Sequence, residues 1–130
     1  MIGADPRFWL VAHSGRHGMP PGFFAPEAFA NHLAALETPG TIAAICEDYR
    51  AAATIDHLHD RESRAAGRRI LAPLAVLWGA RGKVATWYDV PAIWRLYADD
   101  LRLAEALPAG HYLAEEAPAA VLDAFCRFFG

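Results

Sequence analysis

One histidine lies where reactive groups are commonly found, just beyond the end of an expected β-strand. The segment Leu101–Leu107 alternates apolar and polar residues and predicts that strand, and His111 follows it in a short loop, directly after Gly110. In an open parallel sheet, ligands bind in the crevice beyond the carboxyl ends of the strands. An imidazole at that place can act as a general base near neutral pH, so His111 is the first candidate for a catalytic residue.

A second group of residues has the composition of a metal site. His57, His59 and Asp60 form an H-x-H pattern with an adjacent carboxylate, which recurs in zinc proteins. The segment is strongly charged and predicts a helix, on which side chains two positions apart point to different sides. We therefore interpret it as a solvated connector and expect no metal site. Cys46 and Cys126 each lack a neighbouring cysteine, which favours two small buried groups over a zinc knuckle or a redox pair.

The second half of the chain predicts alternating strands and helices. Leu74–Trp78 is a short apolar run that ends at Gly79, as expected for a strand in a parallel sheet. Helices are expected from Asp89 and from Pro118, on either side of the strand at 101–107. Strands that are joined through a helix run parallel, so this order predicts an α/β fold. The last helix is expected to present its apolar side chains to its neighbours: Val121, Leu122, Phe125, Phe128 and Phe129.

The first half of the chain predicts helices only. Asp5-Pro6 places a capping carboxylate and a proline at a helix start, Pro26 begins a second helix, and Thr38 or Thr41 can cap a third. The charged segment Asp56–Arg69 predicts a short helical connector.

The two halves differ in their hydrophobic period, which predicts two parts, 1–68 and 69–130. The strand at Leu74–Trp78 would have one partner in this chain, so an edge and an apolar face of the sheet would be open to water. We therefore expect the chain to be the C-terminal part of a larger α/β protein.

Composition narrows the classes of partner. The 130 residues correspond to one domain or part of one, and their net charge is -3 with no basic cluster longer than Arg68-Arg69. That distribution argues against nucleic-acid binding. The sequence contains neither an apolar run long enough to span a bilayer nor the pattern of a signal peptide. We expect a cytoplasmic protein that binds a small-molecule substrate, with neither nucleic acid nor membrane as a partner.

Several stretches of the sequence resemble one family of enzymes. The run from Leu107 to Pro118 (LPAGHYLAEEAP), which follows the strand ending in Leu77-Trp78-Gly79, looks like the end of an α/β-hydrolase. The run Cys46–Asp56 (CEDYRAAATID), together with Ile2–Pro6 (IGADP), resembles the helical cap of the haloacetate (fluoroacetate) dehalogenases. The resemblance implies the C-terminal part of an α/β-hydrolase fold. Its cap portion would be 1–68, followed by the last two parallel strands and their helices in 69–130.

The resemblance also implies a reaction and the residues that carry it out. In that family an aspartate attacks the carbon that bears the halogen and expels halide, and a histidine then activates the water that hydrolyses the aspartyl ester. His111 matches this general base. Tyr49 matches the cap tyrosine that, with a His-Trp pair, donates hydrogen bonds to the departing halide. The mechanism implies no cofactor and no metal, and the full-length enzyme could be a homodimer.

The family's nucleophile does not match any residue of this chain. In such hydrolases the nucleophile precedes the acid and the histidine along the sequence, and neither serine of this chain lies in a G-x-S-x-G elbow. We therefore expect the nucleophile and the acid upstream of residue 1, and no turnover by the chain alone.

Two alternatives to the dehalogenase remain open. An epoxide hydrolase or an esterase of the same fold would share His111 and differ at the nucleophile and in the cap. Epoxide hydrolases also use cap tyrosines, so the sequence Cys46–Ala51 is what favours the dehalogenase. The other alternative is an inactive truncated fragment or a non-catalytic module. An in-frame upstream sequence with an aspartate at a G-x-D-x-G elbow would favour the dehalogenase, and a serine there would favour the esterase.

Overall fold

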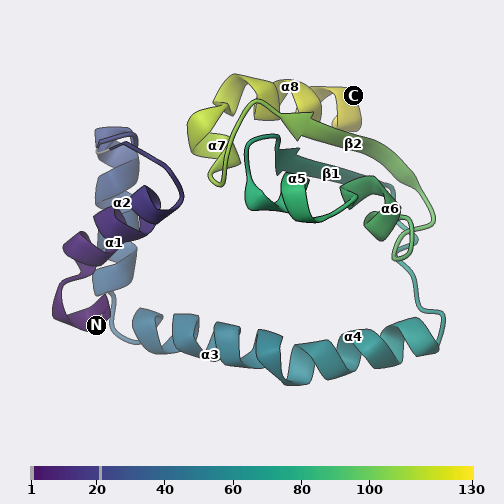
Figure 1. Cartoon of the computed structure of the whole chain (residues 1–130), viewed down its shortest axis with the longest axis horizontal. Helices are drawn as coiled ribbons and strands as arrows, with labels where there is room; N and C mark the ends of the chain where they lie inside the picture. The colour runs from purple at the N-terminus through teal and green to yellow at the C-terminus, as the bar shows by residue number, and fades with distance from the viewer. Residues whose placement is uncertain (1, 21) are drawn as a thin grey trace. The chain divides into compact units, whose positions relative to one another are not determined.

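The computed structural model describes residues 2–20 and 22–130, which divide into two compact units, Met1–Arg61 and Glu62–Gly130. The described residues of the first unit form helices and the loops between them (Figure 1). The second unit contains a two-stranded parallel sheet with short helices. The helices of the first unit are η1 (Ile2–Ala4), α1 (Pro6–Arg16), α2 (Pro26–Glu37) and α3 (Thr41–Ala53), and α4 (Ile55–Ala65) crosses the boundary. The second unit continues with β1 (Leu74–Gly79), α5 (Lys83–Trp87), α6 (Val90–Trp94), β2 (Leu101–Leu107), α7 (Leu113–Glu116) and α8 (Pro118–Phe129).

The two helix starts predicted at Asp5 and Asp89 are confirmed. Asp5 accepts a hydrogen bond from the Phe8 N–H at 2.8 Å, and Asp89 accepts one from the Ala92 N–H at 3.0 Å. Each carboxylate satisfies a backbone donor that has no partner within its helix.

The start of α3 differs from the prediction. Gly40 is its N-cap residue, with φ of 88°, and no side chain caps the helix there. Thr41 is already helical, and the Thr38 hydroxyl donates to the Ala34 carbonyl at 3.0 Å at the end of α2. A left-handed residue turns the chain more sharply than a threonine cap does, and only glycine adopts it without strain.

The first unit is held by contacts between neighbouring helices. Helix α1 packs on α2 and α2 packs on α3. The buried apolar residues of this unit are Leu10 of α1, Leu36 of α2 and Phe24 of the loop between these helices, each 7% exposed. The predicted helical connector is confirmed as α4, which ends in a Schellman motif around Gly67.

Both predicted strands are confirmed, and they pair in parallel as predicted. The register runs from Leu74 opposite Leu101 to Gly79 opposite Leu107, with one shift after Leu74. Helix α5 contacts β1, whereas α6 and α8 contact β2 (Figure 1). Leu107, 1% exposed, is the most deeply buried large side chain of the described residues. The core of this unit therefore lies at the carboxyl end of β2.

The helices of the second unit depart from the prediction in several ways. The sequence analysis missed α5 and α7, which have five and four residues. The apolar side of α8 was expected to pack on neighbours, but Leu122 and Phe129 are 63% and 77% exposed. Cys126 was expected to be buried and is also exposed. A sheet of two strands covers only the Ala124 side of α8, and that residue is fully buried.

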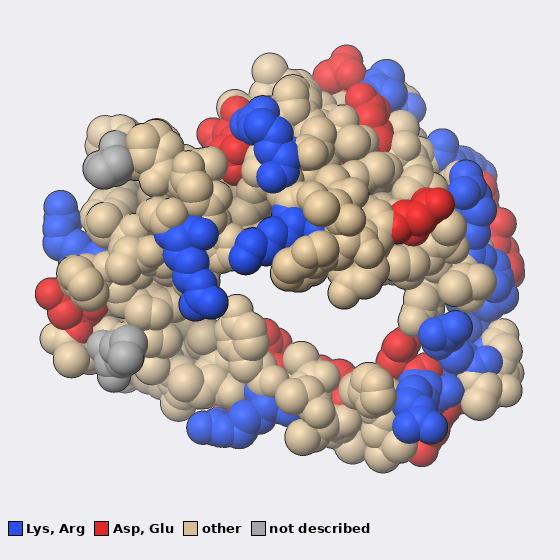
Figure 2. Space-filling view, viewed as in Figure 1, with Lys and Arg blue, Asp and Glu red and all other residues tan. Residues whose placement is uncertain are grey.

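An arginine joins the entry of β1 to the turn before β2. The Arg69 guanidinium pairs with Asp99 and donates to the backbone carbonyls of Leu96, Arg95 and Ala98 at 2.6–3.0 Å. Elsewhere on the unit, Arg127 pairs with Glu105. On the face shown in Figure 2, acidic and basic side chains are interspersed, as they are in these two ion pairs.

Candidate functional site

The sheet places His111 as the sequence predicts, in the loop after the carboxyl end of β2. Its side chain is exposed, and its ring lies edge-on to the Tyr112 ring, with centroids 4.9 Å apart and planes at 88°. Four residues earlier, Leu107 is buried in the core of the unit. An exposed imidazole therefore follows closely on a fixed strand end, where a general base can reach a bound substrate.

The loop after β1 is hydrogen-bonded to the loop that carries His111. The Ala80 N–H donates to the Leu107 carbonyl at 2.8 Å, and the Arg81 N–H donates to the Ala109 carbonyl at 2.9 Å. The Arg81 guanidinium also donates to the Pro108 carbonyl at 2.7 Å. These bonds extend the pairing of the two strands past their ends, so the two loops form one hydrogen-bonded edge.

This edge leaves no room for a side chain at Gly79. A Cβ atom at that position would lie 1.8 Å from the Gly110 carbonyl oxygen and 2.7 Å from the Ala109 carbonyl oxygen. Both are backbone atoms, which cannot rotate away as a side chain could. Gly79 is therefore required for the close approach of the two loops.

A buried carboxylate, Glu116, completes the same loop. It accepts hydrogen bonds from the Gly110 N–H at 2.7 Å and the Tyr112 N–H at 3.0 Å, and from the Arg81 guanidinium at 3.1 Å. Its side chain is 6% exposed. Burial alone would raise its pKa, but the two backbone donors and Arg81 outweigh burial and hold the pKa below the usual value of a glutamate. The carboxylate is therefore charged at neutral pH.

The sequence analysis did not single out Glu116. Glu115 and Glu116 together look like a solvated acidic pair in a polar loop. The one usable signal was the position of a carboxylate within the first turn after a glycine-containing loop, where backbone N–H groups have no helical partner. That signal is common, and only the folded loop shows which of the two carboxylates turns inward.

Tyr49, the candidate for halide binding, lies on α3 in the first unit. The residues that share its predicted helix face, Ile42, Ile45 and Cys46, are half-buried, whereas Tyr49 is 69% exposed. Its phenol is thus exposed on a helix face whose other apolar residues are half-buried. Tyr49 and His111 belong to different units.

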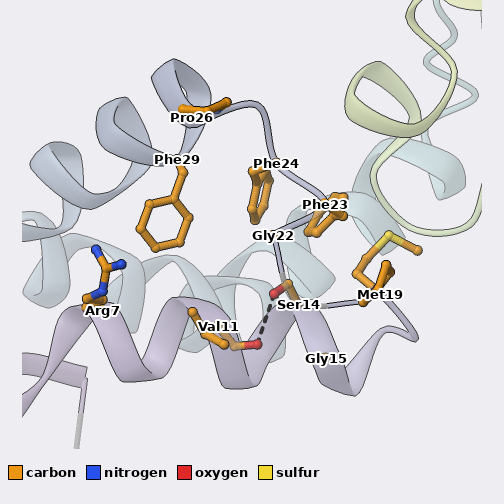
Figure 3. Close-up of a pocket in the computed structure, with 11 residues that line it drawn as sticks. Arg7, Val11, Ser14, Gly15, Met19, Gly22, Phe23, Phe24, Pro26 and Phe29 are labelled. Carbon is orange, nitrogen blue, oxygen red and sulfur yellow. Dashed lines mark hydrogen bonds between the residues drawn. The ribbon is translucent and has the colours of Figure 1, made fainter.

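The first unit also contains an apolar cavity of about 570 Å³ between α1 and α2 (Figure 3). Phe24 and Phe29 form one side, and the Arg7 guanidinium lies over the Phe29 ring, 5.0 Å from its centroid. The Ser14 hydroxyl donates its proton to the Val11 carbonyl at 2.9 Å, so this proton is not available to a ligand. A cavity of this kind suits an apolar group better than a polar one.

His57 and His59, the two histidines of α4, are exposed on the helix. Within residues 2–20 and 22–130, no group of three or more histidines, cysteines or carboxylates is close enough to hold a metal ion. No helix in the same residues has the length and hydropathy to cross a membrane.

Several solved structures are similar to the chain over nearly its whole length. A protein from Nostoc sp PCC 7120 that is described as an α/β hydrolase matches 98% of the chain, with a TM-score of 0.88 and 41% identity. A protein from Salmonella enterica that is described as an acyltransferase matches 99%, with a TM-score of 0.86 and 40% identity. A variant of a protein from Pseudomonas aeruginosa that is described as an epoxide hydrolase, solved with bound MFA, matches 98%, with a TM-score of 0.84 and 37% identity.

The chain spans only 42–43% of the length of these three structures. No family model matches it. The expected fold class is nevertheless confirmed, because the helical segment followed by two parallel strands matches part of an α/β-hydrolase fold.

Proposed function

We propose that the chain supplies the general base and a halide-binding tyrosine to an α/β-hydrolase that removes halide from small haloacids. His111 would activate the water that hydrolyses an aspartyl ester, and the Tyr49 hydroxyl would donate a hydrogen bond to the departing halide. The observation that carries the proposal is the exposed His111 on a loop fixed by the ends of both strands. The match to hydrolase structures supports the class of reaction.

The choice of a haloacid depends on the cap sequence around Tyr49. The run Cys46–Ala51 resembles the dehalogenase cap, and the exposure of Tyr49 on α3 is compatible with contact to a ligand. The nucleophile is not among these residues, so the reaction requires an aspartate from a further part of the fold.

An epoxide hydrolase is the second candidate. The chain is 37% identical to the matched part of the Pseudomonas aeruginosa enzyme of that description. In that reaction Tyr49 would protonate the epoxide oxygen instead of binding halide. Both reactions use His111 in the same role, so activity on the two substrates distinguishes them, whereas loss of His111 does not.

A chimera tests the proposal directly. The chain replaces its matched segment in the Pseudomonas aeruginosa epoxide hydrolase, and halide release from fluoroacetate and chloroacetate is measured beside opening of an epoxide. We expect halide release that is lost in His111→Ala and kept in His57→Ala, a matched exposed histidine on α4. Epoxide opening without halide release would favour the second candidate. A folded chimera that is inactive on both would reject both.

The isolated chain provides the complementary measurement. A base without a nucleophile retains little of the activity of a complete site, so we expect no halide release from the 130-residue chain alone. Halide release that depends on His111 in the isolated chain would contradict the assignment of the nucleophile to another segment.

A further inference from the structure

The carboxylate of Glu116 binds the backbone on both sides of His111. It accepts from the N–H of Gly110, which precedes the histidine, at 2.7 Å, and from that of Tyr112, which follows it, at 3.0 Å. Hydrogen bonds to an ionised acceptor are shorter and stronger than those between neutral groups. Two such bonds around one residue restrict the backbone dihedral angles that set the direction of its side chain.

Arg81 connects this carboxylate to the first strand. Its guanidinium donates to Glu116 at 3.1 Å and to the Pro108 carbonyl at 2.7 Å. The Arg81 side chain is 62% exposed and that of Glu116 is 6% exposed, so the buried charge is paired with one that remains solvated. The pair can then be ionised without the full cost of burying two charges.

The Glu116 carboxylate also lies close to the Gly110 backbone. A Cβ atom at Gly110 would lie 3.1 Å and 3.2 Å from the two carboxylate oxygens of Glu116. The loop backbone and the carboxylate are thus in close contact, in agreement with the hydrogen bond from the Gly110 N–H.

We propose that Glu116 is a positioning residue, whose carboxylate, paired with Arg81, fixes the backbone on both sides of His111 and thereby the direction of its imidazole. The contacts of Glu116 are observed in the structure, but their importance for catalysis rests on the proposed function of His111. A base must be held close to its productive geometry, and displacement by about 1 Å can cost about a hundredfold in rate.

The first test follows the loop by NMR in the intact 130-residue chain. We expect Glu116→Gln to speed the exchange of the Gly110 and Tyr112 amide protons by about tenfold or more, as for loss of hydrogen bonds to a charged group. The ring cross-peaks of His111 should move toward those of His57 and His59, which are exposed on α4. Arg81→Ala should shift the same signals in the same direction and by less.

Two comparisons separate positioning from a general structural role. Glu105→Gln also removes one carboxylate charge and breaks the ion pair between Glu105 and Arg127 in the same unit. It should leave the His111 signals unchanged. Glutamine has nearly the volume of glutamate, so a space-filling role would leave Glu116→Gln like the wild type. Unchanged amide exchange and unchanged His111 signals in Glu116→Gln would overturn the proposal, as would an equal response in Glu105→Gln.

The chimera gives a second readout that keeps the two proposals apart. If His111 is the base, Glu116→Gln should lower kcat at least tenfold with KM nearly unchanged, since substrate binding does not use the carboxylate. Altered His111 signals in an inactive chimera would support the positioning role and reject the proposed function. Full activity of Glu116→Gln would reject the positioning role and leave the function intact.

Discussion

The loop that carries His111 and the helix that carries Tyr49 are held in place by different means. Around His111, strand ends, backbone hydrogen bonds between loops and the buried Glu116 all fix the same short segment. Tyr49 lies on α3 and is 69% exposed. His111 is therefore positioned by contacts to its own loop, whereas the position of Tyr49 depends on the position of α3. Substitutions close to His111 in sequence should therefore change its position more than substitutions close to Tyr49 change the position of that residue.

The largest expected effect lies at the core behind the His111 loop. Leu107→Ala removes a side chain that is 1% exposed and should lower the free energy of unfolding of the second unit by about 2–5 kcal/mol. Urea denaturation followed by far-UV circular dichroism measures the change. Leu122→Ala, at a position that is 63% exposed, is the control and should change the stability by about 0.5 kcal/mol or less. Equal effects of the two would contradict the core described above.

Replacement of glycine by alanine should change the stability in opposite directions at Gly79 and at Gly15, which belong to different units. Gly79→Ala places a Cβ against the Gly110 carbonyl and should destabilise by about 1–3 kcal/mol while displacing the His111 loop. Gly15→Ala adds a Cβ in open space within α1 and should stabilise by about 0.4–1 kcal/mol. Thermal denaturation of both variants tests the pair, and stabilisation by Gly79→Ala would show that the loops do not approach as closely as described.

Acidification should loosen the His111 loop before it affects the helix of Tyr49. The pKa of Glu116 is lowered in the folded state, so its carboxylate contributes stability that is fully present above pH 4.5 and is lost as the pH falls through the lowered pKa. The amide shifts of Gly110 and Tyr112 should titrate in that acidic range. The titration should be absent in Glu116→Gln, and its persistence there would assign it to another group.

The smallest expected effect on stability is at Tyr49. Tyr49→Phe removes one exposed hydroxyl and should change the free energy of unfolding by about 0.5 kcal/mol or less. If Tyr49 binds the departing halide, the same variant should lower halide release by the chimera by about tenfold or more. Tyr88→Phe, at an exposed tyrosine of the second unit, provides the matched control. Equal rates for the two variants would remove Tyr49 from the site.

Local signals in the sequence predicted most of the elements. Asp5 and Asp89 were recognised as caps because a carboxylate and the next few N–H groups suffice to start a helix. The two strands were recognised from their apolar runs. Helices α5 and α7 were missed because four or five residues are too few to show a helical period.

The parts that were missed depend on contacts between distant residues. The sequence correctly placed His111 beyond a strand. The close approach of Gly79 to Gly110 could not be predicted, because it joins two loops 31 residues apart. The role of Glu116 depends on its side chain turning inward, which only the folded loop shows. The exposure of Leu122 and Phe129 was missed for a related reason. An apolar helix face predicts burial, but the neighbours that would bury it are not specified by the helix itself.

The strand β1 has a consequence for how the chain behaves at high concentration. Among the described residues it pairs only with β2, so its other side presents unpaired backbone groups along LAVLWG, six residues without charge or proline. Short segments of this composition stack into cross-β assemblies when they are exposed. Pro73 before the strand and Arg81 and Lys83 after it flank the segment as gatekeepers that oppose such stacking. Solubility should therefore depend on these three flanking residues more than on the net charge of the chain.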